Sequence, residues 1–516
     1  MAGDYIGYVE TLRHRYPNLR RFCEIQGARN VKNKGETSRI VVIEIRENGI
    51  SQEHFSSADE LERYMQDPPS RSEPCKHRVY VLEGTAPAYV QVLGRRLRMD
   101  PYVFAEQLMR GGTRKEQAAT LPTQHGLERW FSMQYVESRA FPNGQLDTLG
   151  ACCLYRDRKI WVTKINSKFD EVAKVHRIAS FWSRREPNGS FNGLILVDPP
   201  VGEFIKIGKG AEKEIRLCQN NLYQGGYVDI SPFPCALDLE KEWGSWESQP
   251  GPTRKSLFDD ILFYWNHIDR FPNLHSSIME SPAGFFDGAS FFLKSVIAAN
   301  WMQFLVYFDE IIDRLEYALA RADIKALDGV ENHLVDVTHW HRRCWKSCEQ
   351  VEHAIHSLQP NFHLNRNSSL TGGSAFNSID NFVYIHGKLC ALTERCQRLS
   401  VSLTNVITVI QSREASEEAH SLKILTLLGM LFVPLTFLSS IFSMSGEFLP
   451  GEGSFWIYIV VSIPAVIMVF LVVFSKEVAQ LLKLREKPTK SLLNVRLTAR
   501  RTMTFGPTEA KDAEKG

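Results

Sequence analysis

Small and hydroxyl-bearing side chains recur at spacings of three and four in an uncharged stretch of the sequence, residues 424–446. On a helix with about 100° per residue, they would share one face within about 80°. They are Gly429, Val433, Thr436, Ser440 and Ser443, and the opposite face carries Leu431, Leu435, Leu438 and Phe442. Hydroxyl oxygens on such a stripe can bind a hydrated ion and line a narrow pore, but small residues also let helices pack closely. The spacing alone supports both interpretations equally.

Side chains that could bind a soft metal recur further towards the N-terminus, at His339, His341, Cys344, Cys348, Glu352, His353 and His356. On a helix, His341, Cys344 and Cys348 come close together on one face, and these ligand types suit zinc. The spacing matches no closed tetrahedral site, so the alternative is that the cysteines are core residues beside partly exposed histidines. An acidic group nearer the uncharged stretch is interpreted either as a solvated face or as an ion exit or sensor: Glu414, Glu417 and Glu418.

Motifs for enzymatic chemistry are missing from the sequence. The segment Gly208-Lys209-Gly210 lacks the remaining glycine and the Ser or Thr of a P-loop, and no nucleophile elbow, HExxH or dinucleotide fingerprint occurs. A net charge of +2, with 44% hydrophobic and 23% charged residues, indicates neither disorder nor binding of nucleic acid or another polyanion. The ten cysteines are scattered without a CxxC pair, which indicates reduced thiols without structural disulfides. We therefore expect neither an enzyme nor a cofactor.

Two apolar stretches near the C-terminus are long enough to cross a bilayer. Residues 424–446 and 453–475 each span about 23 residues, and a hydrocarbon core needs roughly 20. A third apolar stretch, residues 295–308, has only about 14 residues between Lys294 and Asp309, a length typical of a buried soluble helix. The sequence therefore predicts an integral membrane protein with two spans, at about 424–443 and 455–475.

The distribution of basic residues predicts the orientation of these spans. The loop 443–454 has no Lys or Arg, whereas eight follow the second span: Lys476, Lys483, Arg485, Lys487, Lys490, Arg496, Arg500 and Arg501. Residues 1–10 lack the apolar region of a signal peptide. We expect both termini in the cytosol, the plasma membrane as the location, and no glycan on Asn188 or Asn367.

The rest of the chain divides into a mixed and a helical part. Residues 36–240 alternate β-rich and helical runs, with strands expected at 39–45, 78–82, 159–165 and 193–197 and a helix starting at Asp100-Pro101. After a linker at 243–253, helices are expected at 255–268, 284–321 and 331–358. The last cytosolic helix has a heptad seam for packing against helices of this chain or of sister chains: Phe382, Ile385, Leu389, Leu392, Cys396, Leu399, Leu403, Val406 and Ile410. No Pro or Gly interrupts residues 388–423, so the helix can continue into the first span as a rod of about 60 residues and roughly 90 Å.

The sequence from Lys423 reads KILTLLGMLFVPLTFLSSIFSMSGEFLP, followed by a short acidic loop and the second span. It resembles the pore helix of the CorA family of divalent-cation channels, with its Pro-Leu-Thr-Phe centre and Gly-Met-Asn end. The centre matches as it stands, Pro434 to Phe437, and Met444 occupies the Met position, but Ser443 replaces the Gly and Ser445 the Asn. Residues 93–108 and 193–200 are similar to stretches of fungal members of this family.

The resemblance implies a funnel-shaped homopentamer with an α/β cytosolic domain, a stalk helix that continues into a pore-lining span, and a second span facing lipid. It implies passive transport of hydrated Mg²⁺ and related divalent cations. The pore line would be Leu425, Gly429, Val433, Thr436, Ser440 and Ser443, with Ser443, Met444 and Ser445 at the outer mouth. Glu447 and Glu452 in the external loop would concentrate cations there.

The sequence thus predicts four parts: a cytosolic α/β domain (1–245), a helical stalk domain (246–420), two membrane spans (421–475) and a basic cytosolic tail (476–516). The expected function is transport of divalent cations, Mg²⁺ first, by a homo-oligomer in a lipid bilayer. Because serines replace parts of the outer motif, a non-conducting or regulatory subunit of the same fold is one alternative. The other is a membrane-anchored protein whose cytosolic part binds a partner.

Overall fold

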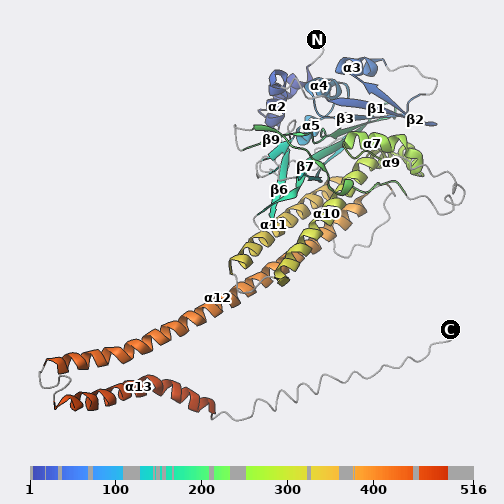
Figure 1. Cartoon of the computed structure of the whole chain (residues 1–516). Coiled ribbons are helices and arrows are strands. Elements are labelled where there is room, and N and C mark those ends of the chain that lie inside the picture. The colour runs from blue at the N-terminus through green and yellow to red at the C-terminus, as the bar shows by residue number, and fades with distance from the viewer. Residues whose placement is uncertain are drawn as a thin grey trace, which may run out of the picture. The chain divides into compact units, whose positions relative to one another are not determined.

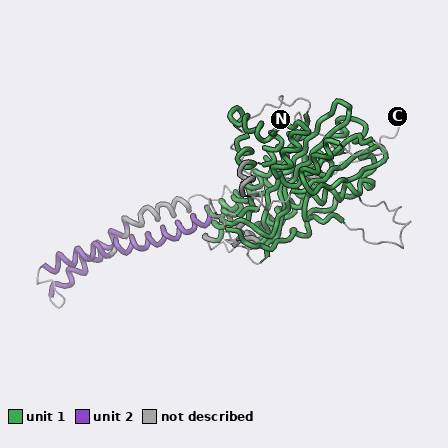
Figure 2. The backbone as a smooth tube through the Cα atoms, turned by 90° about the horizontal axis from the view of Figure 1, so that it is seen from above, with its two compact units in different colours: residues 1–407 green, residues 408–516 purple. Residues whose placement is uncertain are grey.

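The computed structural model describes residues 4–17, 19–32, 38–67, 74–108, 128–142, 146, 151–153, 158–165, 168–208, 214–232, 251–321, 327–359, 376, 378–444 and 453–485. They fall into two compact units, Met1–Ile407 and Thr408–Gly516 (Figure 2). The predicted boundary at 245 and the part of the tail beyond 485 lie outside the described residues.

A mixed β-sheet lies at the centre of the first unit (Figure 1). Its strands are β1 (Arg39–Arg46), β2 (Gly49–Phe55), β3 (His77–Glu83), β4 (Glu128–Ala140), β5 (Ala151–Cys153), β6 (Lys159–Ile165), β7 (Lys168–Arg185), β8 (Phe191–Val197), β9 (Phe204–Ile207), β10 (Glu214–Leu217) and β11 (Asn221–Leu222). The strand order is β10-β9-β5-β6-β7-β8-β3-β1-β2, and β4 pairs with β7 and β11. Only β3 and β8 pair in parallel among these described strands. The four predicted strands are confirmed as β1, β3, β6 and β8.

Two layers of helices cover the sheet. On one side lie α1 (Tyr5–Leu12), α2 (Leu19–Lys32), α3 (Ala58–Gln66), α4 (Pro87–Arg96) and α5 (Pro101–Gln107) (Figure 1). Val42, Leu82 and Leu196 of the sheet share a fully buried core with Val9 and Phe104 of these helices. The sequences of these strands are runs of β-branched and aliphatic residues, because both faces of each strand are buried.

The predicted start of α5 is confirmed. The Asp100 carboxylate accepts a hydrogen bond from the Tyr102 backbone N–H at 2.9 Å, and Pro101 occupies the first helical position. A carboxylate there satisfies a backbone N–H that has no partner within the helix.

Short helices pack on the other face of the sheet: α7 (Leu257–Asn266), α8 (Leu274–Glu280) and α9 (Pro282–Ala289). The Phe286 ring of α9 lies 5.3 Å from the Phe181 ring and 5.7 Å from the Phe131 ring, both on the sheet. Gly284 allows the tight corner between α8 and α9, because a Cβ at this position would lie 2.0 Å from the Ser277 carbonyl oxygen.

The prediction of one helix over residues 284–321 is wrong, because α9 ends at Ala289 and α10 (Phe291–Arg321) begins after Ser290. The Ser290 hydroxyl donates a hydrogen bond to the Phe286 carbonyl at 2.7 Å, which satisfies a carbonyl at the end of α9. The apolar stretch 295–308 lies in α10 and is confirmed as a core helix. Phe291–Tyr317 is apolar enough to cross a membrane, but 72% of its apolar window is buried inside the protein.

The remaining helices are α11 (Leu327–Leu358), α12 (Ile379–Ser443) and α13 (Phe455–Arg485). The predicted seam of α12 is buried within the first unit from Phe382 to Leu403. It packs against helices of the same chain, since the Thr393 hydroxyl lies 3.6 Å from the Cys348 sulfur of α11. Arg395 also forms ion pairs with three carboxylates of α10: Asp309, Asp313 and Glu316.

Candidate ion pathway

The predicted pore line lies on the second-unit part of α12. This helix is apolar from Ile424 to Ser443 and contains Pro434, a residue that is tolerated in membrane helices. All the predicted pore side chains on the helix are exposed in the single chain: Leu425, Gly429, Val433, Thr436, Ser440 and Ser443. Leu425 and Val433 are 66% and 69% exposed, so no other described part of the chain covers this stripe.

The opposite side of α12 packs against α13. The Phe442 ring meets the Tyr458 ring of α13 edge-on at a centroid distance of 5.7 Å. The half-buried side chains of this stretch lie on the same side as Phe442: Leu427, Pro434, Leu435 and Leu438. At about 100° per residue, Ser440 lies roughly 160° from Phe442. The hydroxyl stripe is therefore turned away from α13, a feature that the sequence alone did not reveal.

The hydroxyls on this helix bond back to the backbone. The Thr436 hydroxyl donates to the Phe432 carbonyl at 2.7 Å, and the Thr426 hydroxyl donates to the Leu422 carbonyl at 2.8 Å. A hydroxyl that donates its hydrogen in this way keeps oxygen lone pairs that can accept another hydrogen bond. The Thr436 oxygen can therefore accept a hydrogen bond from water in the shell of a cation.

Two residues shape the backbone along the stripe. A Cβ added at Gly429 would meet no atom within 4 Å, so this position faces open space. Pro434 has no N–H, and the Met430 carbonyl therefore lacks the hydrogen bond that it would receive from an ordinary residue at position 434.

The outer end of the stripe lies at the limit of the described residues. Met444 follows the last residue of α12 and is 89% exposed, and its N–H donates to the Ile441 carbonyl at 3.2 Å. The other predicted residues of the mouth and loop lie outside the described residues: Ser445, Glu447 and Glu452.

The structure does not bring the predicted soft-metal ligands together. Cys344 and Cys348 are buried, whereas His341 is half-buried. Burial raises the pKa of both thiols, which disfavours the thiolate that binds metal. No group of three or more His, Cys, Asp or Glu side chains could hold a metal ion within the described part of the chain. This arrangement agrees with the alternative of core cysteines beside a partly exposed histidine.

The acidic group of α12 lies on the surface, since Glu414, Glu417 and Glu418 are all exposed. Exposure alone does not separate a solvated face from an ion exit or sensor, so both interpretations remain predictions.

Comparison with known proteins finds a family match in the C-terminal part of the chain. Residues 375–476 match the family described as "CorA-like Mg2+ transporter protein". This range holds α12 and most of α13, including the whole hydroxyl stripe. The C-terminal part is thus similar to this family, and it follows an N-terminal α/β domain.

Two solved structures are similar to most of the chain at low identity. The CorA magnesium transporter from Methanocaldococcus jannaschii is 10% identical in sequence, and the match covers 85% of this chain and 98% of the transporter chain with a TM-score of 0.34. The full-length CmaX protein is 10% identical in sequence, and the match covers 86% of this chain and 98% of the CmaX chain with a TM-score of 0.39. A search of curated protein sequences gave no match.

Proposed function

We propose that this protein is the subunit of an oligomeric channel or transporter for divalent cations, with Mg²⁺ as the first candidate. The observation that carries the proposal lies within the matched residues 375–476, where α12 exposes a stripe of small and hydroxyl side chains on the side turned away from α13. In this arrangement α12 lines the path and α13 separates it from lipid.

One stripe cannot enclose a path, so the proposal requires sister subunits. Hydroxyl oxygens that face lipid find no hydrogen-bond partner there, whereas a ring of sister helices encloses water and ions with which these oxygens can interact. A homopentamer, as the family resemblance implies, places one copy of Ser440 from each subunit around the path. Mg²⁺ loses its water reluctantly, and oxygens that bind its hydration shell suit passage of the hydrated ion.

The proposed topology places both termini in the cytosol of a plasma-membrane protein. The basic residues after the second span favour the cytosolic side, and the external loop has no Lys or Arg. The Asn188 sequon supports a simple check, because its side chain lies in an exposed turn and would be accessible to modification in the lumen. Finding a glycan there would contradict the topology.

The deciding experiment is metal flux into liposomes that contain the purified protein, with Mg²⁺, Co²⁺, Ni²⁺ and Zn²⁺ compared at equal concentration. Light scattering in mild detergent first establishes the oligomer. Flux by an intact oligomer supports the proposal. An intact oligomer without flux for any ion would overturn conduction and favour a regulatory subunit, whereas a strict monomer would favour the membrane-anchored interaction protein.

A further inference from the structure

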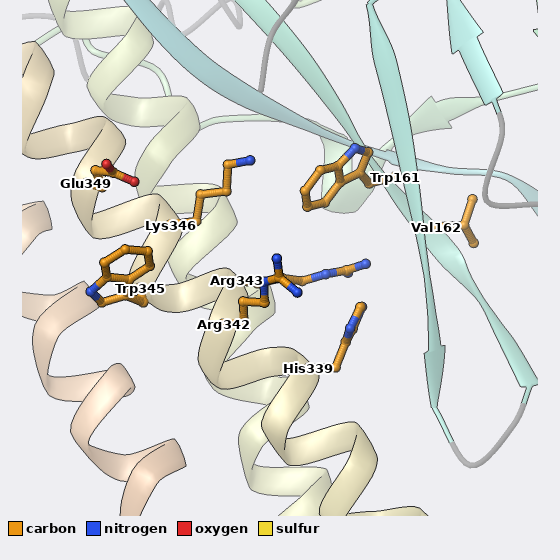
Figure 3. A pocket seen from close by; sticks show the side chains of 8 residues that line it. All are labelled: Trp161, Val162, His339, Arg342, Arg343, Trp345, Lys346 and Glu349. Atoms are coloured by element: carbon orange, nitrogen blue, oxygen red, sulfur yellow. The ribbon is translucent and has the colours of Figure 1, made fainter. Parts of the chain in front are cut away.

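A cavity of about 500 Å³ lies within the first unit, where α11 passes the strand β6 (Figure 3). Its lining combines basic and aromatic side chains: Trp161, Val162, His339, Arg342, Arg343, Trp345, Lys346 and Glu349. The volume lies within the range of about 300–1,000 Å³ that is common for small-molecule sites. None of these residues belongs to the proposed ion pathway.

The cavity collects positive charge from α11. Arg342, Arg343 and Lys346 come from neighbouring turns of α11, and Glu349 is the one carboxylate among the lining residues. Burial and the neighbouring Lys159 lower the pKa of Lys346, and burial lowers the pKa of Arg343 to about 10. Arg343 and Lys346 are therefore held where their charged forms are disfavoured, and a bound anion would reverse that effect.

More basic groups stand behind the lining. His176 of β7 is 6% exposed and lies beside Trp161, with a ring-centroid distance of 5.0 Å. Burial, followed by the charges of Lys346, Lys159 and Lys174, lowers its pKa to about 3. The Nδ1 atom of His176 has no hydrogen-bond partner among the described residues.

Aromatic rings lie beside these cations. The Arg343 guanidinium lies 5.2 Å and the Lys346 ammonium 5.6 Å from the centroid of the Trp161 ring.

The aromatic groups offer flat surfaces beside the cations. Trp161 projects from β6 towards Arg343 and Lys346 (Figure 3). Trp345 also lines the cavity and is 59% exposed, an uncommon position for so large an apolar ring. Indole rings stack on planar bases, and Arg and Lys bind phosphate oxygens. The two kinds of group occur together in one cavity of small-molecule size.

We propose that this cavity binds a nucleotide, with the phosphates at Arg342, Arg343 and Lys346 and the base against Trp161 or Trp345. The volume of about 500 Å³ and the single cluster of cations suit a mononucleotide better than a polymer, and the net charge of the chain, +2, agrees with this. The small net charge hides the cluster, which explains why composition did not indicate an anion site.

The test is equilibrium binding of ATP to the intact, full-length oligomer in detergent, with EDTA present so that no metal contributes. Adenosine and inorganic tripolyphosphate are compared as probes of the base and of the phosphates. We expect ATP to bind more tightly than either probe, with affinity that falls as salt is raised. Failure of ATP to bind at millimolar concentration would overturn the proposal, as would anionic vesicles binding in its place.

Variants locate the site. The double variant Arg342→Gln, Lys346→Gln should weaken ATP binding at least tenfold, whereas Arg398→Gln, an exposed cation of α12, should leave it unchanged. Trp161→Leu should weaken ATP binding and leave tripolyphosphate binding unchanged. Equal affinity in the double variant and the parent, in oligomers that elute alike, would show that ATP binds elsewhere. Tripolyphosphate binding as tightly as ATP would refute recognition of the base.

Discussion

Replacing Ser440 by Leu tests whether the α12 stripe lines the ion path. Ser440 is exposed and lies roughly 160° from the Phe442 side that packs on α13. In a homo-oligomer the change places one apolar side chain per subunit at the same level of the path. Such a ring excludes water and stops ions by dewetting.

The size of the effect follows from the cost of a charge in apolar surroundings. One charged side chain costs at least roughly 3 kcal/mol at the centre of a bilayer. Two charges on one ion therefore add at least about 6 kcal/mol to the barrier. Each 1.4 kcal/mol is about a tenfold change in rate, so flux should fall by roughly 10⁴-fold or more. A fall of this size reaches the background of a liposome assay.

Leu438→Ala is the control, because it changes a side chain on the opposite side of the same helix. Leu438 is half-buried on the side of Phe442 and lies about 160° from Ser440 around the helix, so its side chain projects away from the stripe. We expect this variant to conduct like the parent. Both oligomers must first elute at the parent's size, since a folding defect would lower flux for either.

Two results would refute this assignment. If Leu438→Ala is blocked and Ser440→Leu conducts, α12 is rotated from the orientation that we propose. If both variants conduct like the parent, α12 does not line the path, and the stripe serves helix packing.

Three further predictions follow from other parts of the chain. Replacing Glu447 and Glu452 with Gln should lower flux at low divalent concentration and weaken its dependence on ionic strength, whereas unchanged flux at low salt would mean two solvated loop acids. Arg158 and Asp198 form a fully buried ion pair at 2.7 Å, so Arg158→Met alone should lower the free energy of unfolding by roughly 3–5 kcal/mol. In thermal unfolding, the double variant Arg158→Met, Asp198→Asn should lose less stability than the two single variants lose in sum. Burial lowers the pKa of His77 from 6.5 to about 4, so its neutral side chain contributes fully to the free energy of unfolding above pH 6.5. This contribution should fall by up to about 3 kcal/mol as the pH drops towards 4. The free energy of unfolding of His77→Gln, measured over the same pH range, should lack this dependence.

The elements that the sequence predicted well have local signals. The strand over residues 159–165 is β6 with the same bounds, and the Asp100-Pro101 pair starts α5 as expected. Each signal arises within a few residues: β-branched and aromatic runs for the strands, and a capping carboxylate followed by proline for the helix. Tertiary packing then reinforces these local preferences and does not override them.

The features that the sequence could not predict depend on residues far apart in the chain. The break at Ser290 follows from the packing of α9 against the sheet, and the cavity at Trp161 needs β6 and α11 to meet across 180 or so residues of sequence. Periodicity identifies the apolar face of a helix but not its partner. For this reason the sequence placed His341, Cys344 and Cys348 on one helical face without showing that both cysteines are buried.

The structure changes which part of α12 we expect to hold an oligomer together. From the sequence, the heptad seam of α12 could pack against helices of this chain or of sister chains, and the hydroxyl stripe could line a pore between sister helices. The structure buries the seam from Phe382 to Leu403 within the chain, where Arg395 also binds α10, so this stretch of seam is already occupied. The stripe from Leu425 to Ser443 remains exposed and still needs partners. We therefore expect assembly to depend on the membrane part of α12, because that is where the single chain leaves polar side chains that lipid cannot satisfy.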